Sequence, residues 1–159
     1  MTEETSALLE ADHETILKIL PHRYPFLMID RVRDIHPGKS GVGIKNVTFN
    51  EPHFQGHFPE HPVMPGVLVI EAMGQTAVVM LGLSRGIRDQ MMIYFTTVDM
   101  AKFRRPVVPG DVLELHVELK RARSRIARFE GRAIVNGQVA AEAEFSAMVQ
   151  MPKTDESES

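Results

Sequence analysis

The chain has 159 residues, a length that fits one domain with a substantial core. Its 43% hydrophobic and 25% charged residues are typical of a soluble globular protein, and its net charge of -3 indicates neither a nucleic-acid binder nor an acidic tail protein. The absence of cysteine excludes disulfides, thiolate metal sites and a cysteine nucleophile, and it fits a reducing cytoplasm.

The N-terminal part predicts one helix followed by a hairpin. The leucines and isoleucines of residues 6–20 cluster towards both ends of that segment, which indicates a short amphipathic helix ended by Pro21. The first twenty residues are acidic where a secretory signal would be basic, so we expect no signal peptide. Residues 25–38 and 39–49 are rich in β-branched and aromatic residues and meet at a Pro-Gly turn, which predicts an antiparallel hairpin.

A long apolar run follows and predicts a buried helix over residues 66–83. From Val67 to Leu83 the only polar side chains are those of Glu71, Gln75 and Thr76. Seventeen residues are at the short limit for crossing a bilayer, and a carboxylate near one end argues against a span. We therefore expect a core helix surrounded by protein on most sides, and no membrane.

The second half of the chain predicts long antiparallel strands. Residues 91–107 have strand character, and residues 112–121 alternate between apolar and polar side chains, as in a strand with one buried face. Asn136-Gly137 is a strong hairpin signal between 129–135 and 139–149. The pattern predicts an α+β fold in a single domain over residues 1–150, followed by a polar, disordered tail at 151–159. Because one sheet leaves edges and a second face to cover, we also expect a homo-oligomer.

Three histidines spaced by four residues, His53, His57 and His61, precede the apolar helix. This spacing aligns metal ligands on a helix, but the prolines of residues 52–62 exclude a helix there, so we predict no metal site. A rigid loop with incidental surface histidines accounts for His53 and His61. His57 differs, because it lies between a glycine and a rigid Phe-Pro pair.

Glu71 raises the question of why a carboxylate lies in an apolar helix. It follows Gly66 by five residues, or about 7.5 Å along the axis, and Gln75 is one turn further on the same face. Burial favours the neutral carboxylic acid, which beside a neutral histidine would form an acid–base pair. The alternative is a carboxylate paired with an arginine of the sheet. The first-turn N–H groups near Gly66 could bind a developing oxyanion, or Pro65-Gly66 merely starts the helix.

Basic residues are concentrated between 102 and 132, a segment that holds nine of the 18 Lys and Arg residues and only four acidic residues. Such a patch suits docking of an acidic partner, although solvated strand faces would produce the same composition. Few aromatic residues interleave with these charges, which disfavours nucleic acid.

Three segments resemble the signature blocks of the FabZ-type (3R)-hydroxyacyl-[acyl carrier protein] dehydratases: "LPHRYPFLMIDRV", "NEPHFQGHFPEHPVMPGVLVIEAMGQ" and "KFRRPVVPGD". The similarity covers residues 15–149. The resemblance implies a hotdog fold, in which a curved antiparallel sheet wraps a long central helix. It also implies dimers, assembled three to a hexamer, with an active site at each dimer interface.

The resemblance also assigns roles to residues. It implies that His57 is the catalytic histidine and that Glu71 is the catalytic glutamate, contributed by the opposite protomer. It matches Gly66 to the backbone N–H that binds the thioester carbonyl and Tyr94 to an aromatic lining the acyl tunnel. Phe58, Val67 and Gln75 are the further candidates for substrate binding. The chain departs from the family pattern at His53, where phenylalanine is usual, and at Gly74, where alanine is usual.

The activity that the resemblance implies is dehydration of (3R)-3-hydroxyacyl-[acyl carrier protein] to the trans-2-enoyl thioester in fatty acid biosynthesis, in the cytoplasm. His57 would act as base and Glu71 as acid, without a metal or organic cofactor, since the phosphopantetheine arrives with the substrate. The expected partner is acyl carrier protein, docked by these basic residues: Lys102, Arg104, Arg105, Lys120, Arg121 and Arg123.

Four alternative functions are less favoured. A dehydratase that also isomerises the double bond carries aspartate where this chain has Glu71. A hotdog thioesterase would need a carboxylate placed to activate water on the carbonyl. R-specific enoyl-CoA hydratases place aspartate before histidine in a short motif that this sequence lacks. A non-catalytic acyl-thioester-binding protein of the same fold would not need both His57 and Glu71.

Overall fold

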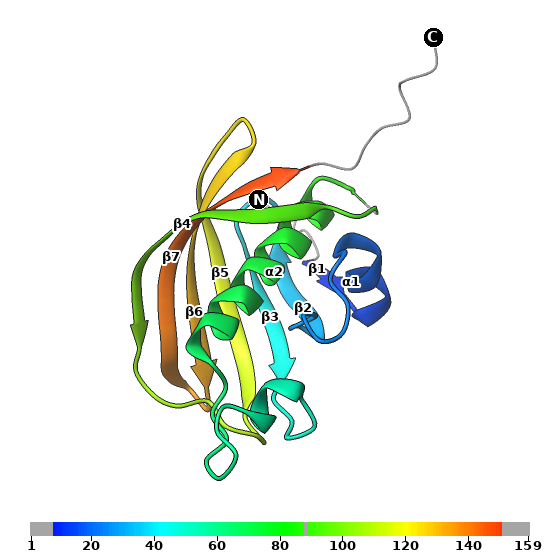
Figure 1. Ribbon diagram of the computed structural model, residues 1–159. Coiled ribbons are helices and arrows are strands. Elements are labelled where there is room, and N and C mark those ends of the chain that lie inside the picture. The colour runs from blue at the N-terminus through cyan, green and yellow to red at the C-terminus, as the bar shows by residue number, and fades with distance from the viewer. Residues whose placement is uncertain (1–7, 88, 151–159) are drawn as a thin grey trace, which may run out of the picture.

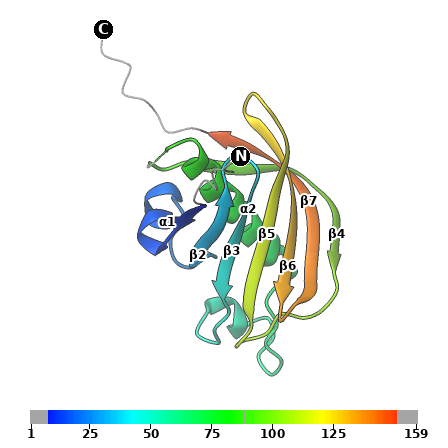
Figure 2. The same cartoon turned by 180° about the vertical axis from the view of Figure 1, so that it is seen from behind.

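The computed structural model describes residues 8–87 and 89–150, and in them a curved sheet wraps one long helix (Figures 1 and 2). The elements in chain order are β1 (Leu9–Ala11), α1 (His13–Ile19), β2 (Arg31–His36), β3 (Ser40–Asn46), the 3-10 helix η1 (Pro52–Gln55), α2 (Gly66–Ser84), β4 (Met92–Phe103), β5 (Val112–Arg123), β6 (Ile126–Val135) and β7 (Gln138–Gln150). The sheet has the strand order β1-β2-β3-β5-β6-β7-β4, and all its neighbours are antiparallel. This is the predicted α+β hotdog arrangement.

Helix α2 is the centre of the core, as its composition predicts. Apart from Glu71, every residue from 69 to 83 is buried, and α2 contacts strands β1 to β7. The helix is long and apolar enough to cross a bilayer by length and composition, but 78% of that window is buried inside the protein, which identifies it as a core helix. Thr76 Oγ1 donates to Ala72 O at 2.9 Å, so this buried hydroxyl is satisfied within the helix.

Close contact between sheet and helix depends on a glycine. A Cβ atom at Gly43 of β3 would lie 2.1 Å from Thr76 Oγ1, a distance at which the two elements could not pack as they do. A side chain at this position would therefore push β3 away from α2.

The long strands follow the predicted patterns. Leu113, Leu115 and Val117 of β5 are buried, as their alternation with polar residues predicts. Asn136 and Gly137 both have positive φ, 49° and 77°, as a two-residue type I′ turn between β6 and β7 requires.

The structure corrects the N-terminal prediction, because residues 9–19 form two elements rather than one helix. Leu9 and Ala11 of β1 pair with Ile35 and Val32 of β2. Asp12 then caps α1 by accepting from the Thr15 N–H at 2.9 Å, so the helix begins only at His13. Residues 6 and 7, and the tail predicted at 151–159, lie outside the described residues. The hairpin is also shorter than predicted, since β2 begins at Arg31.

Strand β4 is an exposed sheet edge. Eleven of its twelve residues are exposed. They include these large apolar side chains: Met92, Tyr94, Phe95, Val98, Met100 and Phe103. A long edge strand with an apolar surface is the kind of feature that proteins cover with another element or another chain.

Candidate active site

His57 lies in a loop that precedes α2, and hydrogen bonds between backbone groups hold this loop together. The His57 N–H donates to His53 O at 3.0 Å, and the Val63 N–H donates to His57 O at 3.0 Å. The His57–Phe58 peptide bond is cis. The prolines here do not exclude all helical structure, contrary to the prediction, because Pro52 starts η1 at a position where its missing N–H costs nothing.

The hydrogen bonding of the His57 ring assigns its tautomer. His57 Nδ1 lies 2.7 Å from Val63 O. A carbonyl oxygen can only accept, so Nδ1 carries the hydrogen and, in the neutral ring, Nε2 has the free lone pair. The imidazole is therefore oriented as a base at Nε2.

The His57 ring lines a cavity that also includes the start of α2. Its volume is about 440 Å³, and its lining includes His57, Gly66, Val67 and Phe103. The N–H groups of Leu68 and Val69 donate to Pro65 O, whereas those of Gly66 and Val67 have no acceptor among the described residues. A Cβ atom at position 66 would lie 2.5 Å from the Phe103 ring, so glycine lets this ring approach the helix end. A base and unpaired N–H donors thus line one cavity.

Glu71 lines a second cavity, of about 520 Å³, whose lining includes Phe26, Val67, Phe95 and Val98. Its side chain is 27% exposed, so in one chain it is less buried than the apolar sequence around it predicts. No lysine or arginine of the described residues forms an ion pair with Glu71, so the alternative of an arginine-paired carboxylate does not describe this structure.

Gln75 holds Glu71 from within the same helix. Gln75 Nε2 donates to Glu71 Oε1 at 3.0 Å and to Phe26 O at 2.7 Å, and its Oε1 accepts from the Met28 N–H at 2.8 Å. The residue is fully buried. Its amide is therefore occupied in joining the segment 26–28 to Glu71, and it has no exposed surface for a substrate.

A residue that the sequence reasoning missed lies beside Glu71. His22 Nε2 is 3.4 Å from Glu71 Oε1, and His22 Nδ1 is buried with no hydrogen-bonding partner in the described part of the chain. His22 is separated from Glu71 by almost fifty residues and follows no helical or strand spacing with it. The local signals for His22 were the flanking prolines Pro21 and Pro25 and its place in the block "LPHRYPFLMIDRV".

Phe58 and Tyr94 lie outside the linings of both cavities in the single chain. Phe58 is 51% exposed and stacks on His57 with ring centroids 4.1 Å apart. Tyr94 is exposed on β4, with its hydroxyl 3.8 Å from Met92 Sδ.

His53 is half-buried rather than the surface residue that was expected. Its ring packs on Phe54 with centroids 4.2 Å apart. Burial lowers the pKa of His53, Lys45 and His57 lower it further, and Glu51 opposes them. No group of three or more His, Asp or Glu side chains within 8–87 and 89–150 is arranged to hold a metal ion.

The basic residues predicted to dock a partner fall into separate places. Arg104 and Arg105 line the His57 cavity, and Arg104 donates to Glu142 at 2.8 Å. This hydrogen bond lowers the pKa of Glu142. Arg121 and Arg123 are exposed at the turn between β5 and β6, at the opposite end of the sheet from the His57 loop (Figures 1 and 2).

The remaining two basic residues, Lys120 and Lys102, both lie beside carboxylates. Lys120 forms ion pairs with Glu118 at 3.3 Å and Glu130 at 3.2 Å, and their hydrogen bonds raise the pKa of Lys120. Lys102 lies beside Glu142 in a hollow separate from the His57 cavity.

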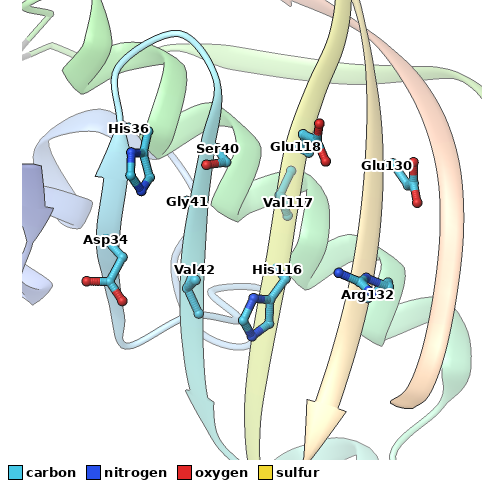
Figure 3. A pocket seen from close by; sticks show the side chains of 10 residues that line it. All are labelled: Asp34, His36, Ser40, Gly41, Val42, His116, Val117, Glu118, Glu130 and Arg132. Atoms are coloured by element: carbon cyan, nitrogen blue, oxygen red, sulfur yellow. The ribbon is translucent and has the colours of Figure 1, made fainter. Parts of the chain in front are cut away.

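A further hollow lies on the face of the sheet that points away from α2 (Figure 3). Its volume is about 300 Å³, and polar side chains such as Asp34, His36, His116, Glu118 and Arg132 line it. None of the predicted site residues lines this hollow.

Comparison with known proteins agrees with this geometry. Residues 20–144 match the model of the FabA-like domain family. The chain is 58% identical over 154 residues to the 3-hydroxyacyl-[acyl-carrier-protein] dehydratase FabZ of Cereibacter sphaeroides strain KD131, covering 96% of this chain and 99% of that protein. It is 56% identical over 155 residues to the FabZ of Jannaschia sp. strain CCS1, covering 96% and 95%.

The fold also matches a solved structure, the dehydratase heterocomplex ApeI:P from Xenorhabdus doucetiae. The TM-score is 0.74 at 19% identity, covering 87% of this chain and 92% of that one, a likeness of fold alone. Family match, relatives and site geometry together place this chain in the FabZ-type 3-hydroxyacyl-[acyl-carrier-protein] dehydratases, within the FabA-like domain family.

Proposed function

We propose that this protein eliminates water from (3R)-3-hydroxyacyl-[acyl carrier protein] to give the trans-2-enoyl thioester in fatty acid biosynthesis, as a cytoplasmic enzyme. The names of its relatives and their identity over almost the whole chain support this reaction. One structural observation carries the chemistry: the His57 ring donates from Nδ1 to Val63 O, which leaves Nε2 as a base in the cavity that also holds the start of α2.

The elimination needs a base, an acid and a site for developing negative charge. His57 Nε2 removes the α-proton, and the electron pair moves toward the thioester carbonyl as enolate character develops. The unpaired N–H groups of Gly66 and Val67 stabilise that oxygen. Glu71 in its protonated form donates to the hydroxyl on C3, so that the C–O bond breaks and the group leaves as water.

His57 and Glu71 line different cavities of one chain, so the proposed site is composite and needs a second copy. Both cavities border β4, through Phe103 at the first and through Phe95 and Val98 at the second. Antiparallel pairing of two β4 edges would bring the His57 cavity of one protomer against the Glu71 cavity of its partner. We propose this dimer as the catalytic unit, with three dimers in a hexamer.

The carrier would dock at the mouth of the site through charge complementarity. Arg104 and Arg105 line the His57 cavity, and their positive charge supports the binding of an acidic carrier there. The phosphopantetheine arm would then enter with its acyl chain, so the protein needs no cofactor of its own. In this assembly, Phe58 and Tyr94 would contact the arm and the acyl chain.

The test is conversion of purified 3-hydroxyacyl-[acyl carrier protein], followed by absorbance of the conjugated enoyl thioester and by assay of free thiol. The proposal expects enoyl thioester without thiol release. Free thiol would indicate a thioesterase, and a shifted double bond would indicate a bifunctional dehydratase/isomerase. Binding without turnover would indicate a non-catalytic acyl-thioester-binding protein.

A further inference from the structure

We propose that His22 is a positioning residue for Glu71. Together with Gln75 it holds Glu71 Oε1 as a hydrogen-bond acceptor, so that the proton which Glu71 transfers resides on Oε2. This inference rests on the proposed function, in which Glu71 is the acid.

The Gln75 amide can adopt only one orientation. Its Oε1 must face the Met28 N–H, which can only donate, and its Nε2 must face Phe26 O, which can only accept. The second hydrogen on Nε2 therefore points to Glu71 Oε1, 3.0 Å away. Glu71 Oε1 thus receives a hydrogen bond from a donor that cannot exchange roles with it.

His22 approaches the same oxygen from a different segment. Its Nε2 lies 3.4 Å from Glu71 Oε1, and its side chain is 19% exposed. A hydrogen on Nε2 would make this ring a second N–H donor beside Oε1, although within the described residues the one hydrogen bond to this oxygen comes from Gln75. Within the described residues only Oε1 of this carboxyl group has such partners. A carboxyl oxygen that accepts from an N–H donor leaves the proton of the neutral acid to the other oxygen.

The segment that holds His22 is fixed at both ends. The Arg23 guanidinium donates to Leu17 O at 2.8 Å, to Leu20 O at 2.8 Å and to His22 O at 2.6 Å, which ties His22 to the C-terminus of α1. Gln75 ties Phe26 and Met28 to α2. The imidazole is therefore presented to Glu71 by a segment held by two helices, and in the same protomer as Glu71.

Substitutions by two amides of different length separate a positioning role from a packing role. Glutamine can place an N–H near the position of the histidine Nε2, whereas the shorter asparagine places it near Nδ1. With 3-hydroxyacyl-[acyl carrier protein] as substrate, we expect kcat of His22→Asn to fall about tenfold and KM to change less than about twofold. His22→Gln should retain most of the wild-type kcat. Thermal unfolding of both variants should match that of wild type.

A matched control is His36→Asn, at an exposed histidine in the hollow on the outer face of the sheet (Figure 3), which should leave kcat unchanged. The decisive measurement repeats His22→Asn in a Glu71→Gln background, by single-turnover kinetics. If His22 acts through Glu71, the second substitution should cost nothing further.

Two results would overturn the inference: a His22→Asn kcat within about twofold of wild type, or the same fold-loss with and without Glu71→Gln. Failure of the proposed function has a different signature, since Glu71→Gln alone would then leave turnover unchanged whatever His22 does.

Discussion

His57 and Glu71 line two different cavities of the same chain, and Val67 is the one residue that belongs to both linings. The imidazole and the helix end lie in the first cavity, and the carboxyl group lies in the second. In the proposed mechanism a single protomer therefore holds two half-sites rather than one site. The apolar β4 edge, which borders both, is the surface through which a second protomer would join them.

Replacement of His57 tests the proposed base. His57→Ala should lower kcat by about 10²–10⁴-fold, the usual contribution of general base catalysis, because nothing else in that cavity can accept the α-proton. Circular dichroism and size-exclusion chromatography should match wild type. His61→Ala is the matched control, at an exposed histidine four residues further on. Turnover by His57→Ala close to that of His61→Ala would remove His57 from the mechanism.

Charge reversal tests carrier docking by the hairpin residues. Arg121→Glu with Arg123→Glu should raise KM for the carrier-linked substrate by about tenfold and leave KM for a short pantetheine thioester unchanged. These residues lie at the far end of the sheet from the His57 loop of their own chain (Figure 1). The proposed antiparallel dimer would present them near the partner's site. Equal effects on the two substrates would show that these residues do not dock the carrier.

The pH dependence of stability should report on His53. Burial lowers the pKa of His53 below its ordinary value of 6.5, with Lys45 and His57 acting in the same direction and Glu51 against them. As the pH falls below 6.5, the unfolded chain binds a proton that the folded chain does not, so the free energy of unfolding decreases. Above about pH 8 both states are neutral at this residue and the contribution is constant.

His53→Phe should remove this part of the pH dependence. Urea unfolding at a series of pH values between 5 and 8 should give a smaller loss of stability on acidification than in wild type. His61→Phe, at an exposed residue, should keep the wild-type slope. An unchanged slope in His53→Phe would contradict the assignment of a lowered pKa to burial of this ring.

Gly74 bears on the shape of the Glu71 cavity. A Cβ atom there would lie 2.6 Å from Phe95 Cζ, at the far end of a ring that lines this cavity. Gly74→Ala gains about 1 kcal/mol of helix propensity, which the displaced ring offsets, so the free energy of unfolding should change by less than about 1 kcal/mol. The moved Phe95 ring should instead change the ratio of kcat/KM between short and long acyl chains.

The matched control for this substitution is Gly82→Ala, in the same helix but outside the linings of both cavities. It should leave the chain-length ratio as in wild type. A ratio unchanged in Gly74→Ala as well would mean that Phe95 does not shape the acyl site.

Much of the fold could be predicted because its signals are local. The apolar run of α2, the alternation in β5 and the Asn136-Gly137 turn each specify an element without reference to the rest of the chain. Strand β1 could not be predicted in this way, because three residues are strand only through their pairing with β2. The capping residue Asp12 was the local sign that α1 begins late.

The features of the site likewise divide into those that the sequence could predict and those that it could not. Glu71 stood out from the sequence as the one carboxylate in an apolar run and His57 by its glycine and Phe-Pro neighbours, and the family resemblance assigned roles to these two residues and to Gly66. The Val63 carbonyl that fixes the His57 tautomer, and the approach of His22 to Glu71, arise from backbone turns and long-range packing. The placing of His57 and Glu71 in separate cavities is likewise a property of the folded chain that no local pattern contains.

The central claim, a site shared between protomers, is tested most directly by mixing two inactive variants. His57→Ala and Glu71→Gln subunits are unfolded together, refolded as a mixture and assayed for enoyl thioester formation. About half of the random dimers pair one variant with the other, and each of these has one intact site, so the mixture should recover about a quarter of the wild-type rate. A mixture no more active than the separate variants would contradict the claim.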